Sequence, residues 1–401
     1  ALGLLLSACT LQQQSNTGFA EAAEPNELIT APSPYLQQHA YSSIDWEPWY
    51  ENAMDRAQAE NKPLLISLGY ASCFWCHKLA RHTLADSGVT RLLNRAFVPV
   101  LIDREERPDL DYLYLHACQL LGDQPCGWPL NVVALPDGRP FRISTYQGPA
   151  AYQEFLRRSL DLYYQAPATV EDIARAAVMP LQAPDLPPIQ QQAFAPAQLE
   201  ELTQAYLQQA DFRHGGLKGA PKFPLPGNYR YLLDHHRFQP NAEALHFVNL
   251  SLHQMADGGI YDHLGGGFAR HTIDGEWRVP RFEKMLPDNA QLVGLYADAF
   301  RQTHDPRYEQ IVYETLAFVA RELTSPEGGF YASLDAETEG QEGFFYTWEQ
   351  IEVDMVLGAE AELFSRCYNL SERGNWMPDK NILYQTLSNE QLAAAYGLDQ
   401  A

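Results

Sequence analysis

The sequence predicts two folds in one chain, an α/β unit followed by an all-helical unit. Short apolar runs alternate with helical patterns between residues 49 and 165, as expected for strands of a buried sheet. A stretch rich in Pro and Gln follows at residues 183–196. Beyond it only helical patterns are found. Because strands that alternate with helices are typical of an α/β sheet, the fold class changes at this stretch.

The elements of the α/β unit follow from apolar spacing and from turn residues. Residues 63–69 are a short apolar run that predicts a buried strand, and Cys73 follows this strand directly. A helical stretch of about ten residues comes next. The remaining predictions are helices over 49–61, 109–121 and 150–165, and strands over 97–102, 131–135 and 141–146, the last two around the turn Pro136-Asp137-Gly138.

The second unit is predicted to consist of helical hairpins. Helical patterns occur near 196–210, 242–256, 287–304, 306–323 and 388–396. Loops of one kind lie between some of them: Gly215-Gly216-Leu217, Gly258-Gly259-Ile260 and Gly328-Gly329-Phe330. Such loops favour an irregular array of helix pairs. The alternative is ordinary capping of helix ends by glycine.

Composition excludes several classes of protein. The chain has 401 residues with 28 Lys+Arg and 51 Asp+Glu, so its net charge is −23. A 46% hydrophobic content is that of a globular protein. The negative charge argues against nucleic acid or an anionic membrane surface as the main partner. No run approaches the ~20 apolar residues that span a bilayer.

The first 24 residues are predicted to be a signal remnant and a tether. Leu6-Ser7-Ala8-Cys9 resembles a bacterial lipobox, in which Cys9 is lipidated, although a chance apolar tail is the alternative. Thr10 replaces the Asp that usually retains such proteins on the inner membrane. We therefore expect a periplasmic protein with a lipid anchor in the outer membrane, and the missing start suggests a fragment.

The motif Cys73-Phe74-Trp75-Cys76-His77 carries the predicted chemistry. A cysteine at a helix N-terminus meets free N–H groups that stabilise a thiolate. Cys73 is then the exposed nucleophile, and Cys76 can resolve a mixed disulfide. No cofactor beyond this redox-active disulfide and no metal is expected. Three alternatives remain open: haem attachment through C-x-x-C-H, zinc bound together with Cys118 and Cys126, and an inert structural pair. Cys118 and Cys126 are also close enough in sequence to pair with each other.

Long motifs in both units resemble the spermatogenesis-associated thioredoxin-like proteins, with coverage from about residue 25 to about residue 385. In the first unit they are Ser33-Pro34-Tyr35-Leu36-Gln37-Gln38-His39-Ala40, Asp103-Arg104-Glu105-Glu106-Arg107-Pro108-Asp109 and Gly127-Trp128-Pro129-Leu130. In the second they are Ala220-Pro221-Lys222-Phe223-Pro224, Gly265-Gly266-Gly267-Phe268, Phe282-Glu283-Lys284-Met285-Leu286 and Asp288-Asn289-Ala290-Gln291-Leu292.

The resemblance implies a thioredoxin-like domain over 25–166, a linker over 167–195 and an (α/α)₆ toroid of the six-hairpin glycosidase and sugar-epimerase type over 196–401. Only seven or eight helices fit after the linker. We therefore expect the toroid to be incomplete at the C-terminus.

In thioredoxin-type folds a proline such as Pro129, which can be cis, packs beside the C-x-x-C and leaves backbone groups free to pair with an extended peptide. We therefore expect Cys73, Cys76 and Pro129 to be catalytic and Trp75, His77 and Trp128 to bind the substrate.

Toroids of this type place acidic and aromatic residues in a central cleft. The resulting candidates for binding a sugar are Asp262, Trp277, Glu283, Asp288, Asp335, Glu337, Glu342 and Trp348. The alternative is that these acids cap helices and face solvent. The chain also departs from the family pattern at Ala269, His271, Arg281 and Pro287, which is compatible with a cleft that binds without turnover.

The function expected first is a thiol–disulfide oxidoreductase acting on protein thiols and disulfides, with the helical unit recognising a carbohydrate or a partner. A carbohydrate-active enzyme, hydrolase or epimerase, with an accessory thioredoxin-like domain is one alternative. A non-enzymatic scaffold with a structural disulfide is the other.

Overall fold

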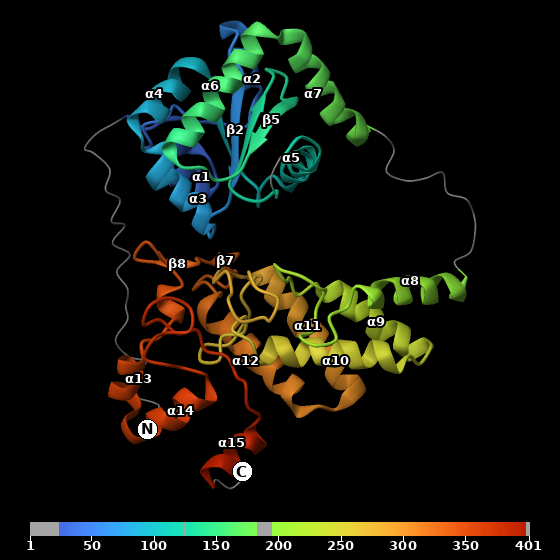
Figure 1. Cartoon of the computed structure of the whole chain (residues 1–401). Coiled ribbons are helices and arrows are strands. Elements are labelled where there is room, and N and C mark those ends of the chain that lie inside the picture. Colours follow the sequence, from blue (N-terminus) through green and yellow to red (C-terminus); the bar gives the residue numbers. More distant parts are fainter. Residues whose placement is uncertain (1–23, 123–124, 183–194, 398–401) are drawn as a thin grey trace. The chain divides into compact units, whose positions relative to one another are not determined.

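The computed structural model describes residues 24–122, 125–182 and 195–397. These residues form two compact units: one comprises residues 24–70 and 75–182 and the other residues 195–397, with which the short segment 71–74 is grouped (Figure 1). Each unit has its own core. The predicted lipidation site Cys9 and the tether lie outside the described residues. Within the described ranges, no helix combines the length and the apolar character needed to cross a bilayer.

The N-terminal unit alternates strands and helices as the sequence predicts. Its elements are η1 (Glu27–Thr30), α1 (Pro34–Gln37), β1 (Glu47–Pro48), α2 (Glu51–Glu60), β2 (Leu64–Gly69), α3 (Phe74–Lys78), the π-helical turn η2 (Leu79–Leu84), α4 (Ser87–Ala96), β3 (Val98–Asp103), α5 (Pro108–Leu121), β4 (Leu130–Ala134), β5 (Pro140–Ser144), α6 (Pro149–Gln165) and α7 (Pro167–Gln182).

A five-stranded sheet with the order β1-β3-β2-β4-β5 forms the centre of this unit. Strand β2 pairs with β3 in parallel and with β4 in antiparallel orientation. All six residues of β2 are buried, which explains why the run is mostly apolar, and its polar Ser67 donates to Asn131 Oδ1. Gly69 and Asp103 are partners at the carboxyl ends of β2 and β3, so both lie at the sheet edge that β2 leaves towards Cys73.

Helices cover both faces of the sheet (Figure 1). Buried residues of α2 and α5 join one core with alternate residues of β2, β3 and β4. On the other side α4 packs with α6. Residues 167–182, predicted to begin the linker, instead form α7, which packs on β5, α5 and α6. The reason is its apolar stripe: Val170, Ala174 and Ala177 recur at helical spacing and are buried.

The C-terminal unit is almost entirely helical, and its described part contains eight α-helices, within the predicted seven or eight. They are α8 (Pro196–Gln208), α9 (Pro226–Phe238), α10 (Ala242–Asp257), α11 (Leu286–Thr303), α12 (Pro306–Glu322), α13 (Gln350–Leu357), α14 (Ala361–Cys367) and α15 (Asn389–Tyr396), with the short turns η3 (Phe344–Tyr346) and η4 (Gly358–Glu360).

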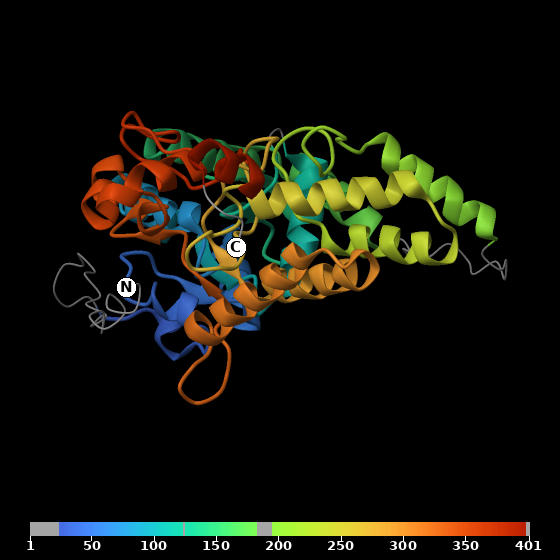
Figure 2. The ribbon, with the colours of Figure 1, turned by 90° about the horizontal axis from the view of Figure 1, so that it is seen from below.

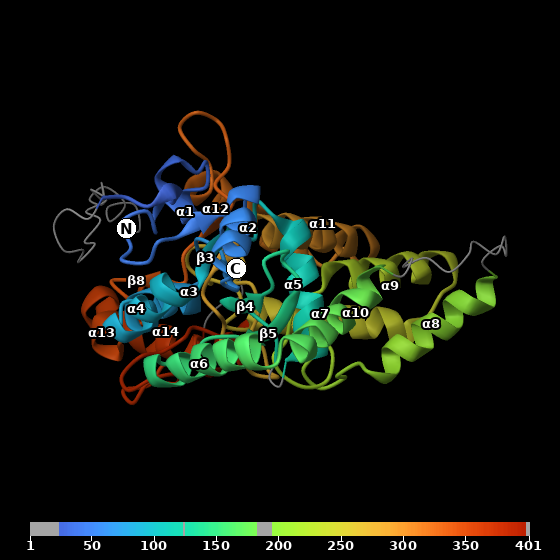
Figure 3. The ribbon, with the colours of Figure 1, turned by 90° about the horizontal axis from the view of Figure 1, so that it is seen from above.

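Helices α9 to α12 pack side by side around one apolar core, as the views from below and from above show (Figures 2 and 3). The expectation of no strands in this unit was wrong. Four two-residue strands occur, β6 (Lys284–Met285), β7 (Ser333–Leu334), β8 (Glu337–Thr338) and β9 (Gln341–Glu342). They form because the long loops fold back and pair their own backbone groups, β6 with β7 and β8 with β9.

Two loops of this unit share one detailed geometry. Asp211 and Asp262 each accept two backbone N–H groups just ahead in their own loop. Each aspartate N–H then donates to a glycine carbonyl five residues on, Gly216 or Gly267. The predicted loop Gly258-Gly259-Ile260 lies between α10 and α11, and the geometry shared with Gly215-Gly216-Leu217 occurs a few residues further on, at Gly266-Gly267-Phe268. Glycine spacing alone does not show which loop closes on itself.

Candidate active site around Cys73 and Cys76

Cys73 lies between the end of β2 and the start of α3, as predicted. Cys73 and Cys76 are each disulfide-bonded. Cys118 bonds to Cys126, and Cys367 is free. Because Cys9 alone cannot pair with two residues, Cys73 and Cys76 are bonded to each other. The motif is thus a disulfide that spans the first turn of α3.

Cys76 is buried within the N-terminal unit, with 4% of its surface exposed. The exposure of Cys73 stays a prediction. The exposure of a side chain depends on everything packed around it, and a strand–helix pattern does not specify those neighbours. The haem alternative is less favoured by the location, because the motif extends a buried strand of an α/β sheet.

Gly69, the last residue of β2, brings two groups close to the disulfide. A side-chain carbon at this position would lie 2.9 Å from Cys76 Sγ and would overlap Tyr35 Oη. The absence of a side chain at residue 69 therefore makes room for both atoms. Burial, and then the negative charge of Asp103, raise the pKa of Tyr35, so its hydroxyl stays protonated.

Trp128 is held in place by three neighbours. Its indole N–H donates to Asp111 Oδ1 at 2.6 Å, and the Arg104 guanidinium lies 3.9 Å from its ring centroid. Arg104 also donates to Asp111 Oδ2 at 3.1 Å, and the ring of Tyr70 meets Trp128 edge-on. The following bond, Trp128–Pro129, is cis. This arrangement orients the backbone that enters β4.

Trp75 and two histidines lie around the motif. The Trp75 ring contacts Tyr146, with centroids 4.9 Å apart, and Lys78 Nζ lies 4.6 Å from the Trp75 ring. His39 packs edge-on against Tyr35. Burial, and then the nearby His77, lower the pKa of His39 to about 4, so this ring is neutral at pH 7.

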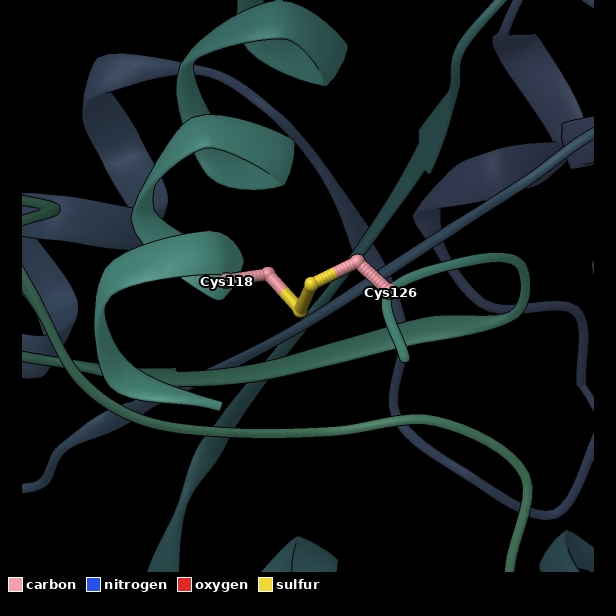
Figure 4. The surroundings of a disulfide bond; sticks show 2 residues. All are labelled: Cys118 and Cys126. Atoms are coloured by element: carbon pink, nitrogen blue, oxygen red, sulfur yellow. A yellow bond between two sulfur atoms is a disulfide. The ribbon is translucent and has the colours of Figure 1, made fainter. Parts of the chain in front are cut away.

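The second disulfide links α5 to the loop before Trp128 (Figure 4). Cys118 and Cys126 have Cα atoms 6.0 Å apart. A zinc site that uses these two sulfurs is contradicted, because zinc binds thiolates and these are joined to each other.

In the helical unit, three of the predicted acids form ion pairs. The two carboxylate oxygens of Glu342 accept hydrogen bonds from the Arg281 guanidinium, at 2.9 and 3.0 Å. Glu283 is buried and lies 3.3 Å from Arg270. Lys284 Nζ lies 2.7 Å from Asp262 Oδ2, and although burial opposes it, this ammonium group lowers the pKa of Asp262.

The other predicted residues of this unit have different surroundings. Trp277 is 0% exposed and donates to the carbonyl of His214, so the prediction that it stacks on a sugar was wrong. The Trp277 ring is buried because neighbouring loops pack closely on it; Gly216, for example, contacts it so closely that a side-chain carbon would not fit. Trp348 is half-buried and pairs by its backbone with Asn381. Asp288 lies in the first turn of α11, Asp335 is exposed, and Glu337 begins β8.

The described pockets of the helical unit are lined mostly by residues that the sequence did not single out, with Asp274 as an exception. A pocket of about 940 Å³ is lined by Arg307, Asp257, His253, Glu314 and Tyr384, among others. A second, of about 630 Å³, is lined by Asp274, Arg278 and Asn375, among others. None of the eight predicted residues lines either pocket. No sequence motif marks these residues, because they converge from separate helices and loops.

Comparison with known proteins places this geometry in context. A family model of a thioredoxin DsbH type, described as "Protein of unknown function, DUF255", matches residues 25–179. Human spermatogenesis-associated protein 20 is 36% identical over 94% of this chain and 52% of its own length. The chain is thus similar to this protein over most of its own residues. The mouse protein is 35% identical over 96% of this chain and 54% of its own length, so the chain spans about half the length of these curated relatives.

Solved structures match each unit in part. A DsbH oxidoreductase is 22% identical, covers 30% of this chain and 85% of its own, with a TM-score of 0.25. A cellobiose 2-epimerase from Spirochaeta thermophila is 19% identical, covers 35% of this chain and 40% of its own, with a TM-score of 0.30. The predicted fold class, a thioredoxin-like unit followed by a helical unit, is confirmed by the sheet, the helices and the family match.

Proposed function

We propose that the chain is a thiol–disulfide oxidoreductase that works through Cys73 and Cys76 and acts on protein thiols or disulfides. One observation carries this proposal: the Cys73–Cys76 disulfide lies at the strand–helix junction of a thioredoxin-like sheet. A helix N-terminus stabilises the thiolate that the chemistry requires.

The proposed reaction is two successive exchanges. In the reduced protein the Cys73 thiolate attacks a substrate disulfide, which forms a mixed disulfide and releases one substrate thiolate. Cys76 then gives up its proton and attacks Cys73 Sγ, which re-forms the protein disulfide and releases the second substrate thiolate. The protein dithiol loses two electrons and the substrate gains them, and the reverse sequence oxidises a substrate dithiol.

Trapping tests this proposal. A Cys76→Ala variant should accumulate mixed disulfides through Cys73, whereas a Cys73→Ala variant should form none and should lose insulin reduction. Cys367→Ala is the matched control, because Cys367 is the free cysteine of the described residues and belongs to the other unit. If the wild-type protein neither reduces insulin nor yields a trapped species as Cys76→Ala, the proposal is wrong.

For the helical unit we propose recognition of a carbohydrate or a protein partner. Arginines pair with Glu283 and Glu342, which favours binding over proton transfer by these carboxylates. The competing assignment is a carbohydrate-active enzyme, and a glycan array with a hydrolysis and epimerisation screen separates the two. Turnover of a sugar would favour the enzyme, and binding without turnover would favour recognition.

A structural, non-enzymatic disulfide is the remaining candidate. It predicts a reduction potential below about −300 mV for the Cys73–Cys76 pair.

We further propose that the protein is periplasmic and anchored by lipid on Cys9. Labelling with a radioactive fatty acid should be lost in Cys9→Ala, and unchanged labelling would contradict the anchor.

A further inference from the structure

The hydroxyl of Tyr35 lies beside the sulfur of Cys76 at the end of β2. Tyr35 is 4% exposed and comes from the short helix α1, where its ring packs edge-on against His39. The group that this hydroxyl can reach at the β2 terminus is therefore decided by the atoms packed around Gly69.

The sulfur of Cys76 is the neighbouring group. Tyr35 Oη and Cys76 Sγ both lie under 3.0 Å from the place that a side-chain carbon of residue 69 would occupy. Gly69 therefore keeps the hydroxyl and the sulfur on the same side of the β2 terminus. A disulfide sulfur is a weak acceptor, but a thiolate accepts strongly.

The negative charge of Asp103 helps to keep the Tyr35 hydroxyl protonated, so that it can donate a hydrogen bond. Its carboxylate accepts the Ser33 hydroxyl at 2.7 Å and the Glu105 backbone N–H at 2.9 Å, so it is held as a buried acceptor next to the tyrosine. Burial and then Asp103 raise the pKa of Tyr35. The phenol therefore keeps its proton at any pH at which the protein works.

We propose that Tyr35 donates a hydrogen bond to Cys76 Sγ once the Cys73–Cys76 disulfide is reduced, and so shifts the redox equilibrium towards the dithiol. The inference rests on the proposed oxidoreductase function and names one residue that tunes it. In the balanced reaction, two glutathione thiols reduce the protein disulfide to a dithiol and become one glutathione disulfide. Tyr35 stabilises only the reduced side, because only there does Cys76 carry a thiol or thiolate.

The experiment compares Tyr35→Phe with wild type in glutathione redox buffers. Alkylation of the peptide with Cys73 and Cys76, read by mass spectrometry, reports the reduced fraction apart from the other cysteines. A hydrogen bond to a charged group stabilises the reduced protein by enough that its loss in Tyr35→Phe should shift the equilibrium about tenfold towards the disulfide. That shift is ~30 mV to a more negative potential.

Tyr114→Phe is the matched control. The Tyr114 hydroxyl is equally buried but donates to the carbonyl of Gly138, in the turn between β4 and β5 at the opposite edge of the sheet. Its equilibrium should equal that of wild type. Gly69→Ala, which crowds the same hydroxyl and sulfur, should shift the equilibrium in the direction of Tyr35→Phe, and circular dichroism verifies folding of each variant.

Three results would overturn the inference: an unchanged equilibrium in Tyr35→Phe, a shift of equal size in Tyr114→Phe, or a shift of Tyr35→Phe towards the dithiol. Failure of the proposed function looks different. In that case the Cys76→Ala variant traps nothing, whatever the potential of the Tyr35→Phe variant.

Discussion

Lys284 Nζ lies 2.7 Å from Asp262 Oδ2 and 2.8 Å from the carbonyl of Gly266. Lys222 makes the same pair of contacts, with Asp211 Oδ2 at 2.8 Å and the carbonyl of Gly215. Both lysines are buried. The helical unit thus contains the same arrangement twice: a buried lysine ammonium group binds both the aspartate and a glycine carbonyl of one loop.

The first prediction concerns this ammonium group. Lys284→Met should lower the unfolding free energy of the helical unit by about 3 kcal/mol, because it leaves the Asp262 carboxylate without its buried partner. Lys218→Met is the control: this lysine is exposed, donates to one carbonyl, and its loss should change stability by less than about 0.5 kcal/mol. Urea denaturation measures both, and equal effects would contradict the role of burial.

The second prediction is an acid-sensitive step in the helical unit. Burial opposes ionisation of Asp211, but the Lys222 ammonium and the backbone N–H groups of His214 and Arg213 together lower its pKa to about 2. The contribution of Asp211 to stability is therefore complete above pH 4 and is lost as the pH falls through about 2. Asp211→Asn should be less stable at pH 7 and should show a flatter loss between pH 4 and 2. Parallel curves in urea titrations would contradict this.

The third prediction concerns His39 in the thioredoxin-like unit. Its pKa is lowered to about 4 by burial and then by His77. Between pH 6.5 and 4 the His39 ring is protonated in the unfolded chain but neutral in the folded one. The unfolding free energy therefore falls as the solution is acidified across this window. His39→Gln should make the unfolding free energy less dependent on pH between 6.5 and 4. A slope identical to that of wild type would exclude His39 as the source.

The fourth prediction separates the two disulfides. The Cys118→Ala, Cys126→Ala double variant should lose about 2 kcal/mol of stability, because the short loop is no longer constrained in the unfolded chain. Trapping through Cys73 should persist in the Cys76→Ala background. Loss of trapping in a variant that is folded by circular dichroism would mean that the second disulfide takes part in the chemistry.

Much of the fold could be predicted from periodicity. Strand β2 and helices α10, α11 and α12 lie within one or two residues of their predicted ranges, because each buries a continuous apolar face. Helix α9 was missed, since its buried residues are set among two histidines, two arginines and a glycine. Helix α7 was missed because the predicted linker was extended from the Pro-rich stretch back over the residues that form this helix.

The sequence by itself determined the two fold classes and the placement of the Cys73–Cys76 motif after a buried strand, because these depend on local patterns of apolar residues and on spacing. The tertiary structure decided which groups surround the motif: Tyr35 lies beside Cys76, and Asp111 accepts the indole N–H of Trp128. It also paired Glu342 with Arg281 and buried Trp277. These relationships join residues far apart in the chain, and only the packing of whole elements brings such residues together.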